Sequence, residues 1–175
     1  INHKLTKNID YNEIAVVLGV QSAITYYDDT FSFYDYINKC SKFLKKIDHK
    51  IYKKIILRLH KNEFNIIDEI KFWNLEHPKI KIHDHKKSLE TLINNSFLTI
   101  FTYEASSFFH SLNIKKPCIY INFDNLDNVN LDVKKIYEVL IDAKILFLEP
   151  NEAVNHLNLI SNKSELMKWW NSEKV

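Results

Sequence analysis

The stretch Glu13-Ile-Ala-Val-Val-Leu-Gly-Val20 decides the fold, because it is a short, uninterrupted apolar run rich in β-branched residues. Such a run predicts a strand that is buried on both faces, and Gly19 predicts where that strand ends. Strands buried on both faces are typical of parallel sheets that carry helices on each side.

Similar apolar runs recur along the chain, and segments with helical spacing separate them. We expect further strands at residues 54–60, 80–83, 97–102 and 117–122, with a short edge strand at 145–148. Helices are expected at residues 30–47, 64–75, from 88 onward, 104–113, 132–143, 151–160 and 163–170. This alternation predicts one α/β domain over residues 1–175, a three-layer Rossmann-like domain with a mostly parallel sheet of five or six strands.

The apolar positions of these segments predict the core. On the inner face of the helix at 104–113 we expect Ala105, Phe108, Phe109 and Leu112. The side chains expected to be nearly fully buried are Val16, Val17, Ile56, Leu57, Ile100, Phe108, Leu112, Ile119 and Ile121.

Composition sets several classes of protein aside. Hydrophobic residues make up 46% and charged residues 26%, as in ordinary soluble domains. The net charge of +2 argues against a nucleic-acid binder, which would carry a strongly basic face. No apolar run is long enough for a transmembrane segment. Cys40 and Cys118 are far apart in sequence, which favours reduced thiols and a cytoplasmic location.

Motifs narrow the choice further. A single glycine excludes the glycine-rich phosphate loops of dinucleotide-binding proteins and P-loop enzymes, and neither GxSxG nor HExxH occurs. We interpret His83-Asp84-His85 as a polar loop rather than a metal site, because no further ligands accompany it at suitable spacing. Trp169-Trp170 is interpreted as a packing patch of a helix.

Polar residues that follow the predicted strands indicate a binding site, because the carboxyl ends of parallel strands share one edge. Arg58 is the only arginine, and its guanidinium could hold two phosphate oxygens. Ser106 and Ser107 open a helix, whose first N–H groups suit an anion. Simpler roles remain open for these residues: a turn glycine, a surface ion pair, helix caps. The candidate ligand-binding residues are Gly19, Arg58, His60, Glu104, Ser106, Ser107 and His110.

The order of segments over residues 53–170 resembles the carboxyl-terminal half of bacterial GT-B-type transferases. Ser106-Ser-Phe-Phe-His-Ser-Leu-Asn-Ile-Lys-Lys-Pro117 followed by Cys118-Ile-Tyr-Ile-Asn122 carries the resemblance. Transferases from bacterial surface-polysaccharide loci are the closer match, through Ile145-Leu-Phe-Leu-Glu-Pro-Asn-Glu-Ala-Val154 and the Trp169-Trp170 pair. Arg58 matches an arginine that ends a strand in that family, whereas His110 stands where the family usually has Glu.

The resemblance implies a glycosyltransferase-like enzyme whose donor substrate is a nucleotide-activated sugar, with no cofactor required. It also implies a further amino-terminal domain that carries the acceptor site, so this chain would be part of a longer two-domain protein. CDP-glycerol-type phosphotransferases show a similar arrangement. Because His110 replaces the acidic residue, a non-catalytic or degenerate interaction domain is the alternative. A response-regulator-like module is weaker, since Asp28 and Asp29 come too late after the first strand.

Overall fold

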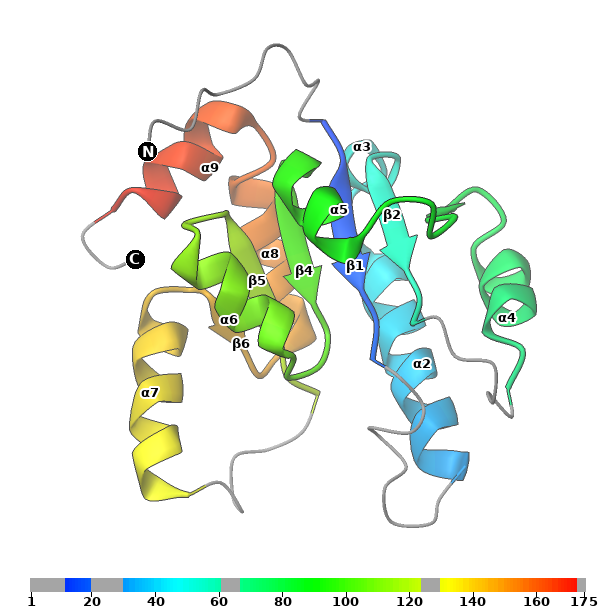
Figure 1. The fold of residues 1–175 in the computed structure, drawn as a ribbon, viewed down its shortest axis with the longest axis horizontal. Coiled ribbons are helices and arrows are strands. Elements are labelled where there is room, and N and C mark those ends of the chain that lie inside the picture. Colours follow the sequence, from blue (N-terminus) through cyan, green and yellow to red (C-terminus); the bar gives the residue numbers. More distant parts are fainter. Residues whose placement is uncertain (1–11, 20–29, 61–66, 124–129, 173–175) are drawn as a thin grey trace.

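A computed structural model describes residues 12–19, 30–60, 67–123 and 130–172. Within these residues the chain forms a parallel sheet in the order β3-β2-β1-β4-β5-β6 (Figure 1). The α/β class and the parallel, Rossmann-like sheet predicted from the sequence are therefore confirmed. The strands are β1 (Ile14–Val17), β2 (Ile55–Arg58), β3 (Lys81–Ile82), β4 (Leu98–Phe101), β5 (Cys118–Ile121) and β6 (Leu146–Phe147).

Helices connect successive strands, as parallel pairing requires, and two more helices follow the last strand. They are α2 (Thr30–Lys46), α3 (His49–Tyr52), α4 (Glu69–Glu76), α5 (Leu89–Asn95), α6 (Ser106–Asn113), α7 (Leu131–Asp142), α8 (Pro150–Leu159) and α9 (Lys163–Trp170). Figure 1 shows α5 and α6 in front of the sheet, with α2 and α8 behind it. The domain thus has the three layers expected from the sequence.

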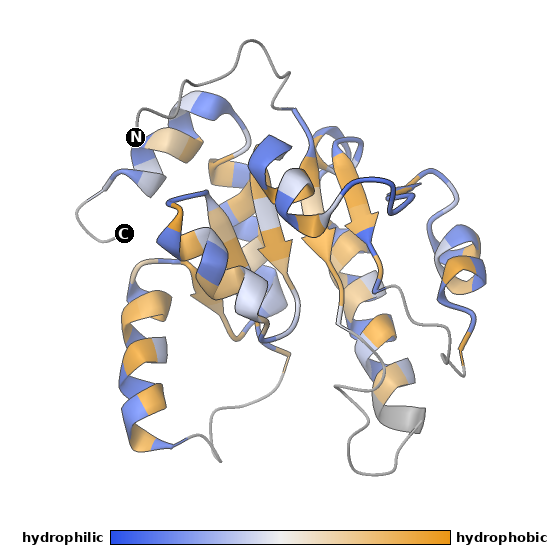
Figure 2. Cartoon of the chain, in the orientation of Figure 1, coloured by the Kyte–Doolittle hydropathy of each residue, from blue (hydrophilic) through white to orange (hydrophobic). Residues whose placement is uncertain are grey.

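Burial on both faces of the sheet explains why its strands are continuous apolar runs. All four residues of β1 are buried, and the pairing of Val16 with Leu57 on one side and with Ile100 on the other places β1 at the centre. Val16 belongs to the apolar cluster shared with α2 and α8, whereas Val17 belongs to the cluster shared with α5, α6 and α7. The apolar colouring of the strands in Figure 2 reflects this burial on both faces.

The predicted core is correct in its strands and partly wrong in α6. Phe108 has no exposed surface, but Leu112 is only partly buried and Phe109 is 43% exposed. A helix of eight residues lying on one face of a sheet buries a narrow stripe, which Phe108 and Ser111 fill. Phe109 lies about 100° around the helix from Phe108, and therefore faces outward.

Two helices begin later than the sequence suggested. The helix expected at 64–75 starts at Glu69, because the Asp68 side chain accepts a hydrogen bond from the Lys71 N–H and caps it there. Residues 64–66 lie outside the described residues. The helix expected at 104–113 starts at Ser106, which leaves Glu104 in the preceding turn.

The tryptophan pair packs, as predicted. The Trp170 indole is buried and donates a hydrogen bond to the Lys115 carbonyl over 3.1 Å, while the Trp169 indole donates to the Ala143 carbonyl over 3.0 Å. The first bond attaches α9 to the segment that precedes β5, and the second attaches it to the segment between α7 and β6.

His156 in α8 makes the fold sensitive to acid. Its ring lies between Phe147 and Trp169, with ring centroids 5.3 and 4.7 Å away, and its buried Nε2 has no hydrogen-bond partner among the described residues. Burial, and secondarily Lys144, lowers the pKa of His156 to about 4. The unfolded chain, with a pKa of about 6.5, therefore takes up this proton first, and stability falls as the pH drops from about 6.5 to about 4.

We accordingly expect His156→Phe to flatten the acid limb of the stability profile. Partial exposure screens the ring, so we expect a gain of about 1 kcal/mol at pH 5, or about 2–4 °C in Tm, and little change at pH 7.5. Thermal melting of both proteins from pH 7.5 to 4.5 measures this. A difference in Tm that is the same at every pH would mean that the two proteins differ in packing and that protonation of His156 does not contribute.

Candidate functional site

The strand order reverses between β1 and β4, which makes their shared carboxyl edge the expected binding crevice. The chain runs outward from β1 through β2 to β3 on one side, and from β4 to β6 on the other. After β1 the chain continues to α2 behind the sheet, whereas after β4 it continues to α6 in front (Figure 1). Ligands of such sheets bind at the carboxyl edge where the strand order reverses, so this edge is the candidate site.

Gly19 lies at this reversal point, one residue beyond the buried Leu18. Its N–H donates a 2.6 Å hydrogen bond to the Tyr36 hydroxyl of α2, and that hydroxyl lies 2.5 Å from the Thr102 hydroxyl at the end of β4. Gly19 does not have a positive φ, so a left-handed turn does not explain the glycine. Its lack of a side chain instead allows a neighbouring group to come close to the backbone. Here the approaching group is a tyrosine of the chain itself.

Arg58 ends β2, next to β1 at the same edge, where it pairs with Val17 in the register. Its Nη1 donates a 2.6 Å hydrogen bond to Nδ1 of His83, the residue that follows β3. Partial burial lowers the pKa of the Arg58 guanidinium, and burial also lowers the pKa of His83. Since β3 lies on the side of β2 opposite to β1, this bond draws the guanidinium away from the reversal point.

The amino terminus of α6 is open at the reversal point. α4, α5 and α7 also begin after strands, and the side chains of Asp68, Ser88 and Asn130 cap them, whereas α8 after the edge strand β6 has no side-chain cap. At α6 the N-cap residue is Ala105, and no described side chain makes the capping hydrogen bond. Ser106 is exposed and Ser107 is half-buried, so the first N–H groups of α6 and two hydroxyls are available to an anion.

Glu104 and His110 flank this open helix end. Glu104 is exposed in the turn after β4, and burial together with this nearby carboxylate raises the pKa of Tyr137 of α7 to about 12. His110 is exposed four residues after Ser106, and thus lies on the same side of α6. A carboxylate and an imidazole beside an anion site suit hydroxyl groups of a sugar.

The structure brings most of the predicted residues to one edge but not into one cluster. Gly19 and the turn at 104–107 flank the reversal point, Arg58 lies one strand away, and exposed His60 lies beyond Arg58 next to residues outside the described part. Asp28 and Asp29 also lie outside the described part. Sequence reasoning missed the roles of Tyr36 and Thr102. A phenol within the apolar stripe of α2 was the available signal, because a buried tyrosine hydroxyl needs a partner.

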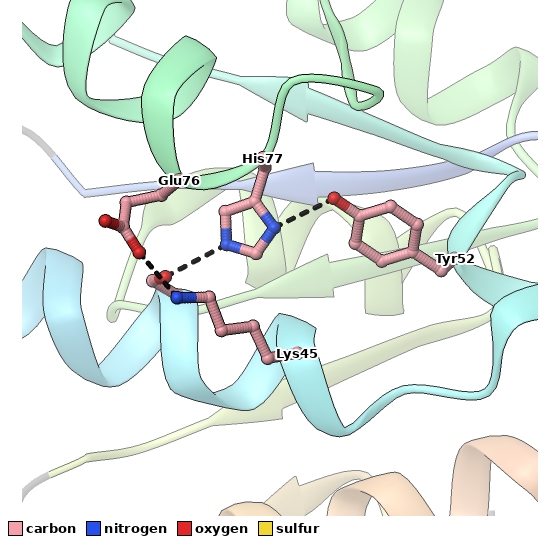
Figure 3. A network of polar contacts seen from close by, with 5 residues as sticks. Lys45, Tyr52, Glu76 and His77 are labelled. Atoms are coloured by element: carbon pink, nitrogen blue, oxygen red, sulfur yellow. Dashed lines mark hydrogen bonds and ion pairs between the residues drawn. The ribbon is translucent and has the colours of Figure 1, made fainter.

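A second polar network lies at the opposite, amino-terminal edge (Figure 3). His77 hydrogen bonds the Ser41 hydroxyl through Nε2 over 2.9 Å and the Tyr52 hydroxyl through Nδ1 over 2.8 Å, while Lys45 and Glu76 form an ion pair. A cavity of about 420 Å³ adjoins them. Ser41 is only 3% exposed and cannot meet a substrate, so this network fastens α2, α3 and α4 together.

The described part of the chain contains neither a group of metal-ligating side chains nor a membrane-spanning helix. Its His, Cys, Asp and Glu side chains form no group of three that could hold a metal ion. In the same ranges, each helix is too short or too polar to cross a bilayer. The His83-Asp84-His85 segment is a loop in which the His85 N–H donates to Nδ1 of His83 over 3.0 Å.

An open parallel sheet that reverses its strand order at its centre and carries helices on both faces defines a Rossmann-like α/β domain. Residues 2–175 match the model of the family described as LIC12162 family transferase, and the chain belongs to that family. No curated protein matches the sequence.

Proposed function

We propose that this chain is the donor-binding half of a nucleotide-sugar-dependent glycosyltransferase of GT-B type, acting in bacterial surface carbohydrate synthesis in the cytoplasm. One observation carries the proposal: in a chain of a transferase family, an uncapped helix terminus lies where the sheet reverses its strand order. Helix termini of this kind hold phosphate groups, which are the common part of nucleotide-activated donors.

The proposed chemistry is neutralisation of a leaving group. In glycosyl transfer the acceptor hydroxyl forms a bond to the anomeric carbon, and the bond to the nucleoside diphosphate breaks, leaving its electron pair on a phosphate oxygen. The N–H groups of α6 would stabilise that developing charge, and so would Arg58 once its guanidinium exchanges His83 for a phosphate oxygen. Glu104 and His110 would bind hydroxyls of the sugar or ribose. The base that accepts the proton from the acceptor would belong to a further domain.

We propose that this site requires no cofactor, because the helix terminus and Arg58 already supply positive potential. The exposed carboxylate of Glu104 opposes the binding of an anion nearby. We therefore assign the phosphates to Ser106 and Ser107, and the uncharged sugar to the side of Glu104.

Isothermal titration of the chain with UDP, GDP, CDP and CMP tests the proposal. We expect one nucleoside diphosphate to bind with a Kd of about 1 μM to 1 mM, and its parent nucleoside to bind much more weakly, since the phosphates make the main contacts. Tightest binding of CMP would instead favour a CDP-glycerol-type phosphotransferase. Absence of binding by all four nucleotides would contradict the proposal and favour a non-catalytic interaction domain.

Arg58→Lys should weaken nucleotide binding about tenfold with nearly unchanged thermal stability, because lysine keeps the charge but offers one point contact in place of a fork. The lysine ammonium can still donate to His83, which preserves the local fold. Titration and thermal melting of the same samples measure the two effects. Lower stability with unchanged affinity would show that the arginine serves only to join β2 to the loop after β3.

A further inference from the structure

Three hydrogen bonds link the end of β1 to the end of β4 at the reversal point, and two of them are made by Tyr36 of α2. The Val17 carbonyl can only accept, so the Thr102 hydroxyl donates to it over 3.0 Å. Thr102 Oγ1 must then accept the proton of the Tyr36 hydroxyl, at 2.5 Å. The Gly19 N–H can only donate, and it donates to the Tyr36 oxygen over 2.6 Å. The direction of every bond in this chain is therefore determined.

This hydroxyl chain is buried. Tyr36 is 7% exposed and Thr102 is 3% exposed, and Gly19 is buried as well. Burial raises the pKa of Tyr36 well above its ordinary value, and the neighbouring Cys40 thiol adds to this, so the phenol keeps its proton. Buried hydrogen bonds that are fully satisfied hold their partners in one arrangement, and an unpaired member is costly. This hydroxyl chain of Tyr36 and Thr102 joins α2, the end of β1 and the turn that leads into α6.

The Gly19 N–H is thus already used. In dinucleotide-binding Rossmann domains, the backbone after the first strand approaches the pyrophosphate closely. Here the Gly19 amide is occupied by a side chain of the same molecule, and among the described residues the start of α6 offers open N–H donors at the reversal point.

We propose that Tyr36 is a positioning residue that takes the place of a phosphate at Gly19 and fixes the turn at 102–105, so that α6 presents its amino terminus to the donor. The expected effect of Tyr36 on nucleotide binding rests on the proposed function. The hydrogen bond from the Gly19 N–H to the Tyr36 hydroxyl does not depend on it. The hydroxyl chain remains intact when a nucleotide binds.

Gly19 gives a direct readout, because it is the only glycine in the sequence. Cell-free synthesis with [15N]glycine therefore yields one backbone amide cross-peak. We expect this amide to exchange slowly with solvent in the free protein and with UDP, GDP, CDP or CMP present. In Tyr36→Phe the cross-peak should move upfield and its exchange should accelerate about tenfold or more, as loss of a buried hydrogen bond requires.

Tyr52→Phe is the matched control. It removes a phenolic hydroxyl that also bonds a buried partner, His77, but at the opposite edge of the sheet. It should lower Tm while leaving the Gly19 cross-peak and nucleotide affinity unchanged. Tyr36→Phe should weaken the tightest nucleotide about tenfold. If Tyr36→Phe does not fold, Thr102→Val breaks the same chain, and Thr102→Ser should restore both the slow exchange and the affinity.

The outcomes separate this inference from the proposed function. Fast exchange of Gly19 in the wild type, or no change in Tyr36→Phe and Thr102→Val, would overturn the hydroxyl chain. A shifted cross-peak with wild-type nucleotide affinity would overturn the positioning role while leaving the donor site standing. A wild-type protein that binds none of the nucleotides would overturn the donor site and the positioning role together, while the slow amide would still support the hydroxyl chain.

Discussion

Ser106→Asp should weaken nucleotide binding by about thirtyfold or more without lowering the melting temperature. A carboxylate in the first turn of a helix interacts favourably with the helix dipole, which is worth about 0.3–1 kcal/mol to folding. The same carboxylate would repel a bound phosphate by about 4 kcal/mol at a separation of about 4 Å and an effective dielectric constant of about 20. Even half of that repulsion weakens binding about thirtyfold. Titration calorimetry and thermal melting of the variant measure the two effects.

Ser164→Asp provides the matched control, since Ser164 is also exposed in the first turn of a helix, α9. It adds the same charge and the same favourable dipole interaction, but far along the chain from the reversal point. Its Tm should be equal to or above that of the wild type, and its nucleotide affinity should be unchanged. Equal affinities of Ser106→Asp and the wild type would show that the phosphates do not bind at α6.

Ile100→Ala should cost about 2–5 kcal/mol of unfolding free energy, because it leaves a cavity that the surrounding strands cannot fill. Ile100 has no exposed surface and lies in the middle of β4, paired with Val16 on one side and Ile119 on the other. Its loss should also loosen the turn that carries Thr102 and the start of α6. Denaturant titration measures the free energy from the shift in the midpoint.

The same substitution at an exposed position is the control. Ile136 of α7 is 56% exposed, so Ile136→Ala should change the unfolding free energy by less than about 0.5 kcal/mol. A cost below about 0.5 kcal/mol for Ile100→Ala would mean that β4 is not a central strand. The reversal point between β1 and β4 would then lose its basis.

The fold could be predicted from the sequence because a strand buried on both faces is a short, continuous apolar run, whereas the helices between the strands are apolar on one side only. Val16 and Val17 face opposite clusters, so neither can be polar, and the run through them is continuous. Likewise, Arg58 and Ser106 could be placed at one edge from strand ends alone. The order of the strands was not predicted, because it depends on which distant runs pair, and each of them is apolar on both faces.

Finer features of the site depend on contacts between separate elements. Tyr36 reads as one more apolar position of α2, and only the structure shows its hydroxyl against Gly19 and Thr102. Arg58 reads as a free cation, although it bonds His83 from another strand. The exposure of Phe109 depends on how narrow a face α6 turns to the sheet. Spacing along the chain does not contain these tertiary contacts.

Amide chemical-shift mapping tests the central claim most directly. A uniformly 15N-labelled chain is titrated with UDP, GDP, CDP and CMP, and the shifts of the assigned amides are followed for the one that binds most tightly. We predict that the largest shifts occur at residues 104–107, with smaller ones at Arg58 and at residues 108–110 of α6. Largest shifts around the amino-edge cavity, at Lys45 and His77, would contradict a donor site at the reversal point.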